Sequence, residues 1–572
     1  MAQYEFFLAS SLEKVFPAQK PAQLPPASTL SAWPGSRTAI QLVYTCQQLQ
    51  PGESRRVYDL TVSGLPYPVS LRQVELLPSE YPCFENVDAD YLSKAPGLFP
   101  DLLRPIAQPV RLQPLPRQYR SIWLSWDLPA EAQAGAYEIT LKLQGVAELT
   151  LPNGQVLSDP AAPGDQRELR FTLNIGHTAL PPQSLIHTEW FHADGLAAYY
   201  QVEPFSEAHW QILANFIQAA GREHGINMLL TPVFTPPLDT AIGHCRMTIQ
   251  LVDIRLEHGT YHFNFDKLAR WTALCQANGI SYLEIAHLFT QWGAAATPHI
   301  VAEINGVIQP IFGWSVPADS PAYRQFLAAF LPALQIELTR LGYDRQHVYY
   351  HISDEPSQRH LDSYQRARAQ VADLLAGCPI MDALSDLDFY RRGLVSLPVP
   401  ANDHIQAFAD ANVPDLWVYY CCSQSNLVPN RFFAMPSYRN RIMGVLMYLY
   451  NIKGFLHWGY NFYYSQYSLK AINPFQVTDA GHAFPSGDAF LVYPGPKGQA
   501  LSSVRAEVQD EALLDLRALQ YLEQLQGRPA VLRLITQTAG MAQLSFTEYP
   551  RDPDFLLRLR ELVARAIEQS LS

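Results

Sequence analysis

Apolar and polar residues alternate in short runs through the first third of the chain. Because successive side chains of a β-strand point to opposite faces, such alternation is typical of strands with one buried face. Turn-forming residues separate the runs, which favours antiparallel strands packed as a sandwich. The pattern predicts an N-terminal β-sandwich over residues 1–180, from runs that include RVYDLTVSGL, IWLSWDL and RELRFTLNI.

The pattern changes after a proline-containing linker, HTALPPQSL at 177–185. Amphipathic segments then alternate with short apolar runs. In the first unit, FSEAHWQILANFIQAA carries an apolar helical face with Ser206 as the expected N-cap, and Gly225 leads into the run INMLLTPVF. Three similar units follow, in which the helix and the strand are separated by Gly279, Gly342 and Gly377. This order predicts parallel strands joined by crossover helices.

Eight candidate strands lie between about 185 and 462. An α/β fold with a (β/α)8 TIM-like barrel over residues 185–500 fits them better than an open sheet, and no GxGxxG or P-loop motif follows any of them. The apolar pattern after 501 predicts a C-terminal helical extension over 501–572. The candidate strands are SLIHTEWFHAD, INMLLTPVF, ISYLEIAHL, HVYYHI, PIMDAL, DHIQAF, LWVYYC and GFLHWGYNF.

Charge and composition narrow the possible partners. The 572 residues include 41 Lys+Arg and 53 Asp+Glu, so the formal net charge is −12. This acidic excess argues against nucleic acid or an anionic membrane surface as a partner, and no apolar run is long enough to span a bilayer. The N-terminal segment lacks the basic region of a secretory signal, and the seven cysteines are scattered. We therefore expect a cytoplasmic protein with reduced thiols.

Two adjacent carboxylates are the strongest candidates for chemistry. Catalytic groups of such barrels lie at the carboxyl ends of the strands, and HVYYHISDEPS brings Asp354 and Glu355 to the end of the fourth strand. Glu355 precedes Pro356, so we expect an extended backbone there. Mutual repulsion raises the pKa of one carboxyl, which makes it a general acid near neutral pH. A solvated helix start is the alternative from spacing alone.

Other strand ends carry aromatic and polar side chains that suit a sugar, since aromatic rings cover its apolar face and polar groups bind its hydroxyls. There is no HxH, HExxH or cysteine cluster, so the sequence predicts neither a metal nor another cofactor. The absence of GxSxG disfavours a serine nucleophile. The expected substrate-binding residues are His192, Asp194, Glu284, His287, Trp292, Tyr419, Trp458, Asn461, Tyr464 and Asp488.

Several of these segments resemble glycoside hydrolase family 123 and the related bacterial proteins that carry the domain of unknown function numbered 4091. The segments are HISDEPS, LFTQWGA, WVYYCCSQ, GFLHWGYNFY and SGDAFLVYPGP, and the pieces GLFPDLL and IWLSWDLPAEAQAGAYEITL are similar to the accompanying β-sandwich. The resemblance covers most of residues 1–525. VRAEVQDEALLDLRAL departs from the acidic, tyrosine-containing helix expected in the family.

The resemblance implies an exo-β-N-acetylgalactosaminidase that acts by substrate assistance on a small glycan with a terminal 2-acetamido sugar. Glu355 would protonate the leaving oxygen and later activate water, while Asp354 would orient the acetamido group. From their positions, Trp458 and Tyr419 would form the pocket wall, and His192, Asn461 and Asp488 would bind hydroxyls.

Two other functions stay open at this stage. One is a conventional retaining glycosidase with Glu284 as nucleophile and Glu355 as acid/base. The other is a carbohydrate-binding barrel without catalysis. The sequence also leaves open galacto versus gluco specificity, the leaving group and its linkage, and whether the chain forms a homo-oligomer.

Overall fold

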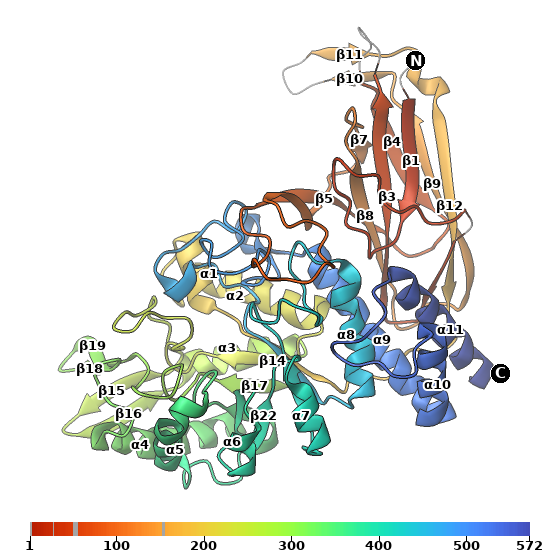
Figure 1. Ribbon diagram of the computed structural model, residues 1–572. Helices are drawn as coiled ribbons and strands as arrows, with labels where there is room; N and C mark the ends of the chain where they lie inside the picture. Colours follow the sequence, from red (N-terminus) through yellow and green to blue (C-terminus); the bar gives the residue numbers. More distant parts are fainter. Residues whose placement is uncertain (1–2, 27, 50–54, 151–154, 572) are drawn as a thin grey trace.

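The computed structural model describes residues 3–26, 28–49, 55–150 and 155–571. Two five-stranded sheets form the N-terminal region, at the upper right of Figure 1. In spatial order the first holds β1 (Gln3–Ala9), β3 (Arg37–Gln48), β8 (Arg120–Asp127), β5 (Ser70–Ser79) and β6 (Gly97–Pro105). The second holds β2 (Thr29–Ala32), β12 (Gln166–Ile175), β9 (Gly135–Gly145), β4 (Tyr58–Ser63) and β7 (Arg111–Leu112), and β10 (Glu148–Thr150) pairs with β11 (Val156–Ser158).

The alternation seen in the sequence explains how these sheets pack. On β9, Ile139, Leu141 and Leu143 are buried, whereas Glu138 just before them and Lys142 between the two leucines are exposed. The buried set forms one core cluster with apolar side chains of the facing sheet, among them those of β3 and β8. The two sheets therefore form a β-sandwich whose core lies between them.

Parallel strands form the centre of the second region. A six-stranded sheet has the spatial order β20 (Val348–Tyr350), β17 (Tyr282–Ile285), β14 (Met228–Thr231), β13 (Ile186–Glu189), β24 (Gly454–His457) and β23 (Trp417–Tyr419). A separate parallel pair holds β21 (Met381–Ala383) and β22 (Leu397–Val399). The prediction of a mixed α/β protein is confirmed. Of the predicted eight-stranded barrel, the continuous sheet shows only a part.

One predicted strand is wrong. DHIQAF is not the sixth strand, because its apolar residues belong to α7 (Ile405–Asp410). Ile405 and Phe408 lie three positions apart and are both buried, which is the spacing of a helical face. The sixth strand is instead β22. Its short segment SLPVP contains two prolines, which are rare within strands, so the sequence pattern does not predict a strand there.

Helices follow the parallel strands, and Ser206 caps the first long one as expected, since its hydroxyl accepts a hydrogen bond from the His209 amide. The chain that follows β14 and β17 contributes an added four-stranded sheet, at the lower left of Figure 1. Its strands are β15 (Asp253–Glu257), β16 (Thr260–Asn264), β18 (Ile300–Ile304) and β19 (Val307–Phe312). The helices are α1 (Ala193–Tyr200), α2 (Glu207–Gln218), α3 (Asp266–Ala277), α4 (Pro321–Arg340), α5 (Leu361–Val371), α6 (Leu387–Arg391) and α8 (Ser437–Leu449).

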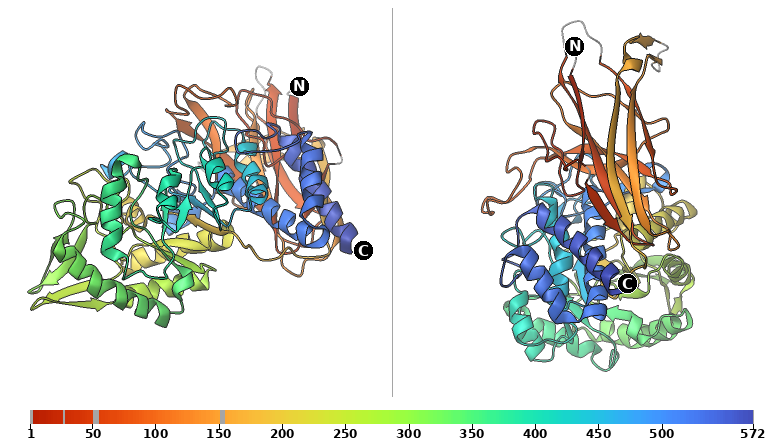
Figure 2. Two further views of the ribbon diagram at one scale, coloured as in Figure 1. Left: turned by 60° about the horizontal axis from the view of Figure 1, so that its bottom comes forward. Right: turned by 90° about the vertical axis from the view of Figure 1, so that its right-hand side faces the viewer.

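Three C-terminal helices, α9 (Val504–Gln526), α10 (Arg528–Ala539) and α11 (Pro553–Leu571), lie beside both regions (Figures 1 and 2). Gly444 allows α8 and α9 to approach closely, because a Cβ at this position would lie 2.0 Å from the Ala512 carbonyl oxygen. The short strands β25 (Tyr493–Pro494) and β26 (Ala500–Leu501) precede α9. Among the described residues, no helix is long and apolar enough to cross a membrane.

Buried ion pairs join α9 to the sandwich. The Arg505 guanidinium contacts both oxygens of Asp101 on β6 at 2.9 Å. Glu507 lies 2.7 Å from Arg72, and all four side chains are buried or nearly so. Burial alone would raise the pKa of Glu507, but the charges of the neighbouring guanidiniums outweigh it and hold the pKa below its usual value. Because buried charges are stable only when paired, these contacts fix the sandwich against the second region.

Removing one partner of these buried ion pairs should destabilise the protein strongly. We expect Asp101→Asn to lower the free energy of unfolding by about 3–5 kcal/mol, because Arg505 keeps a buried charge without its carboxylate. Urea denaturation measures the change. Glu561→Gln is the matched control, since the Glu561–Arg565 pair is solvent-exposed and should contribute about 0.5 kcal/mol or less. Equal effects of the two substitutions would contradict the stabilising role of the buried Asp101–Arg505 pair.

Candidate active site

Side chains from the carboxyl ends of the parallel strands surround a cavity of about 150 Å³. This edge of a parallel sheet is where ligands bind in α/β proteins, because the loops that follow the strands converge there. Both candidate catalytic carboxylates contribute to the lining. The lining residues are Trp190, His192, Leu238, Asp239, Gln291, Trp292, Asp354, Glu355, Ala383, Tyr419, Cys421, Cys422, Leu456, Trp458, Gln466, Tyr467 and Phe484.

The backbone at the carboxylate pair differs from the expectation. Glu355 has φ +42°, in the left-handed region, so the extended conformation predicted before Pro356 is wrong. Contacts with two neighbouring strand ends hold it there: the Glu355 amide donates to the Ala383 carbonyl at 3.1 Å, and the Trp292 amide donates to the Asp354 carbonyl at 3.0 Å. Such strain costs about 1–3 kcal/mol and persists only where the surroundings impose it, typically at functional sites.

The helix-start interpretation of the pair does not fit this geometry. The helical turn that follows spans Gln358–His360 and begins after Ser357. Neither Asp354 nor Glu355 therefore occupies its N-cap. Both carboxylates instead line the cavity.

The environment of the pair favours retention of a proton. Burial raises the pKa of Asp354 well above its ordinary value, and the charge of Glu355 raises it further. Solvent reaches Glu355 through the cavity, but protein atoms enclose it on its other sides and raise its pKa as well. The Tyr419 hydroxyl donates a hydrogen bond to Glu355 Oε1 at 2.8 Å, and this hydrogen bond lowers the pKa of Glu355 against the effect of burial. Two adjacent carboxyls of this kind can donate a proton near neutral pH.

Glu284 lies beneath the cavity and does not line it. Its two oxygens accept hydrogen bonds from the Thr188 hydroxyl at 2.5 Å, the Trp190 indole at 2.6 Å and His351 Nε2 at 2.5 Å. His351 Nδ1 lies 3.1 Å from Asp382 Oδ1. Burial lowers the pKa of His351, but its two carboxylate partners outweigh burial and raise the pKa to about 9. A buried imidazolium between two carboxylates thus supports the cavity floor.

His287 also lies outside the cavity. Its ring stacks on His351 with 4.0 Å between centroids and 16° between planes. Among the described residues, only His287, His351 and Asp382 group three potential metal ligands, within 4.8 Å of one another. Stacked rings direct their nitrogen lone pairs in parallel rather than toward one point, and carboxylates already contact both His351 nitrogens. The stacked arrangement therefore suits a metal ion poorly. His351 and Asp382 belong to a hydrogen-bond network, whereas no hydrogen-bond partner is found among the described residues for either ring nitrogen of His287.

His192 lines the cavity, but both of its ring nitrogens have protein partners. Nε2 lies 2.9 Å from the Trp458 carbonyl oxygen, and Nδ1 lies 3.0 Å from Arg246 Nη2. Burial and then the Arg246 charge lower the pKa of His192 to about 3, so the ring is neutral. Asp194 pairs with Arg246 at 2.8 and 2.9 Å, and the Asn461 amide oxygen accepts from the His192 amide at 2.8 Å. Asp194 and Asn461 thus support this wall from behind.

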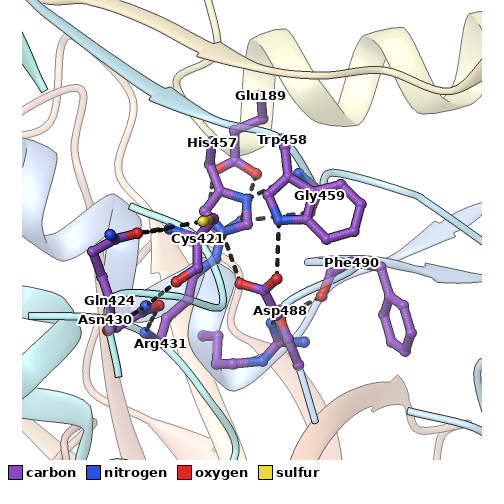
Figure 3. A network of polar contacts seen from close by, with 12 residues as sticks. Glu189, Cys421, Gln424, Asn430, Arg431, His457, Trp458, Gly459, Asp488 and Phe490 are labelled. Carbon is purple, nitrogen blue, oxygen red and sulfur yellow. Dashed lines mark hydrogen bonds and ion pairs between the residues drawn. The ribbon is translucent and has the colours of Figure 1, made fainter. Parts of the chain in front are cut away.

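A buried polar network holds Trp458 (Figure 3). The Trp458 indole donates to Asp488 Oδ2 at 2.9 Å, and His457 Nε2 lies 3.6 Å from the other oxygen of Asp488. Arg431 donates to His457 Nδ1 at 2.8 Å and pairs with Glu189 at 2.6 Å. Asp488 is therefore placed behind the cavity wall, where it fixes the orientation of the indole.

The structure brings together only part of the predicted site. Along with the carboxylate pair, the cavity is lined by His192, Trp292, Tyr419 and Trp458. Residues behind its walls or beneath its floor are Asp194, Glu284, His287, Asn461, Tyr464 and Asp488. Sequence reasoning missed Trp190, which the strand-end rule could have found. It also missed residues in segments without a recognisable motif: Asp239 and Arg246 in loops, and Gln466 and Tyr467 in the short 3-10 helix Gln466–Ser468.

A cavity with a proton-retaining carboxyl pair and aromatic walls is typical of a glycoside hydrolase. The family described as "Glycoside hydrolase 123, catalytic domain" matches residues 190–522, and the chain belongs to this family.

One of the similar solved structures agrees with this chain in fold. A family 123 glycoside hydrolase from Clostridium perfringens, studied for glycolipid glycan hydrolysis, is 14% identical with a TM-score of 0.73, covering 99% of this chain and 98% of that chain. A family 5 mannosidase from Rhizomucor miehei is 11% identical with a TM-score of 0.32, covering 60% of this chain and 95% of that chain, which is too distant to support an argument. No curated protein matches the chain in sequence.

The raised pKa of Asp354 has a consequence for stability. As the pH rises above about 3.9, the unfolded chain loses this proton while the folded state retains it, so the free energy of unfolding falls. We expect Asp354→Asn to remove this cost, raising Tm at about pH 8 by ~2 °C or more, with the gain vanishing near pH 4. Thermal unfolding across this pH range measures it. Asp415→Asn, at an exposed position, should show no such pH dependence.

Proposed function

We propose that this glycoside hydrolase is an exo-acting β-N-acetylgalactosaminidase that retains anomeric configuration through substrate assistance. The observation that carries the proposal is that the adjacent residues Asp354 and Glu355 both line one cavity. A conventional retaining enzyme holds its acid and its nucleophile about 5–5.5 Å apart across the scissile bond. Neighbouring residues of one strand end are poorly placed for that, but they can act on a leaving oxygen and an acetamido group of the same sugar.

Each carboxyl has one role in this mechanism. The acetamido oxygen of the substrate attacks the anomeric carbon while protonated Glu355 gives its proton to the glycosidic oxygen, and the bond to the leaving group breaks. In the substrate complex the proton that the pair retains lies on Glu355, because the positive charge that develops beside Asp354 favours the carboxylate form of Asp354. Asp354 then accepts a hydrogen bond from the acetamido N–H and stabilises the positive charge of the oxazolinium intermediate. Glu355, now a carboxylate, takes a proton from the water that attacks the anomeric carbon, and this attack opens the oxazolinium ring and restores the acetamido group.

The cavity walls support a sugar as the ligand. The rings of Trp190, Tyr419 and Trp458 can cover apolar faces of a pyranose, while the carboxylates face its polar groups.

We also infer that the eight parallel strands together form a (β/α)8 barrel. Parallel bridges Tyr350↔Ile380 and Ala401↔Tyr419, which link the pair β21–β22 to β20 and β23, support this inference.

The two alternative functions have less support. A nucleophilic Glu284 would need to face the sugar, whereas it lies outside the cavity lining and accepts hydrogen bonds from three donors. A binding protein without catalysis has no evident use for a strained Glu355 with a raised pKa. Assignment to a galacto rather than a gluco sugar rests on the resemblance.

Loss of the general acid tests the proposal directly. We expect the protein to hydrolyse aryl 2-acetamido-2-deoxy-β-galactosides and Glu355→Gln to lower kcat/KM by about 10³-fold, because the amide cannot donate or accept the catalytic proton. Initial-rate kinetics measure both. Glu303→Gln, at an exposed position on β18, is the matched control and should keep wild-type activity. Wild-type turnover by Glu355→Gln would contradict the assigned role.

Two inhibitors separate the mechanisms. A thiazoline mimic of the oxazoline should inhibit competitively, and a 2-fluoro sugar should leave no covalent adduct in the mass spectrum of the intact protein. A trapped adduct on Glu284 would support the conventional mechanism instead. Saturable sugar binding without turnover would support the binding protein.

A further inference from the structure

The cavity has a buried inner part and an exposed mouth. Trp190 and Tyr419 are 3% and 6% exposed, whereas Trp292 and Tyr467 are 36% and 38% exposed. Buried strand residues Ala383 and Leu456 close the inner end. If the terminal sugar occupies the inner part, as the proposed function requires, the leaving group must extend toward the mouth.

Two aromatic rings meet at this mouth. The Trp292 and Tyr467 centroids are 5.8 Å apart and their planes are perpendicular, at 90°. This edge-to-face contact leaves two ring surfaces at right angles, open to solvent. Large aromatic side chains exposed beside a binding cavity are typical of recognition sites, because their rings offer contact area at a low entropic cost.

Hydrogen bonds connect the mouth to the segment that carries Asp354 and to Asp239. Trp292 has φ +56°, and its amide donates to the Asp354 carbonyl at 3.0 Å. Tyr467 has φ +59°, and its amide donates to Asp239 Oδ2 at 2.9 Å. The Ser468 hydroxyl donates to the Asp239 carbonyl oxygen at 2.7 Å. Strained backbone held by tertiary hydrogen bonds indicates that the position of both rings matters.

We infer that Trp292 and Tyr467 form the subsite for the leaving group, and that this leaving group is a second sugar ring. One of the two rings covers the apolar face of that pyranose, and the other, which is perpendicular to it, borders the edge of the sugar. Asp239, which lines the cavity beside them, accepts a hydrogen bond from one of its hydroxyls. The substrate class is then a β-linked oligosaccharide ending in a 2-acetamido sugar. The inference rests on the proposed function and adds the residues that recognise the other side of the scissile bond.

Two substrates of the same terminal sugar isolate this subsite. The β-glycosyl fluoride has a leaving group too small to reach the mouth, whereas the β-linked disaccharide with galactose places a ring there. We expect Trp292→Ala and Tyr467→Ala each to lower kcat/KM for the disaccharide about tenfold, and for the fluoride less than about twofold. Asp239 has φ +38°, which asparagine tolerates, so Asp239→Asn should keep the backbone and should also affect only the disaccharide.

The controls make each outcome decisive. Leu562→Ala removes an apolar side chain of similar exposure, 37%, on α11 and should change neither rate. Unchanged fluoride hydrolysis by the variants shows that they are folded. Equal losses for both substrates, or none for the disaccharide, would overturn the inference. Failure of the wild type to hydrolyse either substrate would instead overturn the proposed function.

Discussion

The site depends on the backbone that follows β20, where the chain turns so that two consecutive carboxylates reach one cavity. In a regular strand, neighbouring side chains point to opposite faces. The positive φ of Glu355 breaks that alternation, and hydrogen bonds from the next strand ends, through Trp292 and Ala383, hold the break in place. The same turn places both carboxyls in the lining of one cavity, where the surrounding protein raises both pKa values although the cavity leaves Glu355 open to solvent.

Buried charges behind the cavity wall provide the rigidity that this arrangement needs. His351 lies between Glu284 and Asp382, Arg246 pairs with Asp194, and Arg431 pairs with Glu189. Removal of these charges from water is costly, so each is stable only with its partner in place. Each of these buried groups contacts a side chain that lines the cavity or a residue that holds such a side chain in place. Many strand-end residues therefore belong to the polar network behind the cavity and do not line it.

Sequence patterns predicted the elements better than the details of the site. Alternation and the helix–glycine–strand order indicate the strands and crossovers correctly, but DHIQAF was misread because Ile405 and Phe408 fit either a strand or a helix in so short a run. The strand-end rule finds Trp292, Tyr419 and Trp458, yet it also selects Glu284, which faces the buried layer beneath the floor. Asp239 and Tyr467 come from loops whose course is set by tertiary hydrogen bonds, which leave no periodic signal.

The most direct test of the account is a crystal structure of the protein with the thiazoline mimic bound. We expect the inhibitor in the cavity, with a carboxylate oxygen of Asp354 within about 3 Å of the ring nitrogen and Glu355 facing the position of the leaving oxygen. An inhibitor bound elsewhere, or an Asp354 side chain turned away from it toward solvent, would contradict the account.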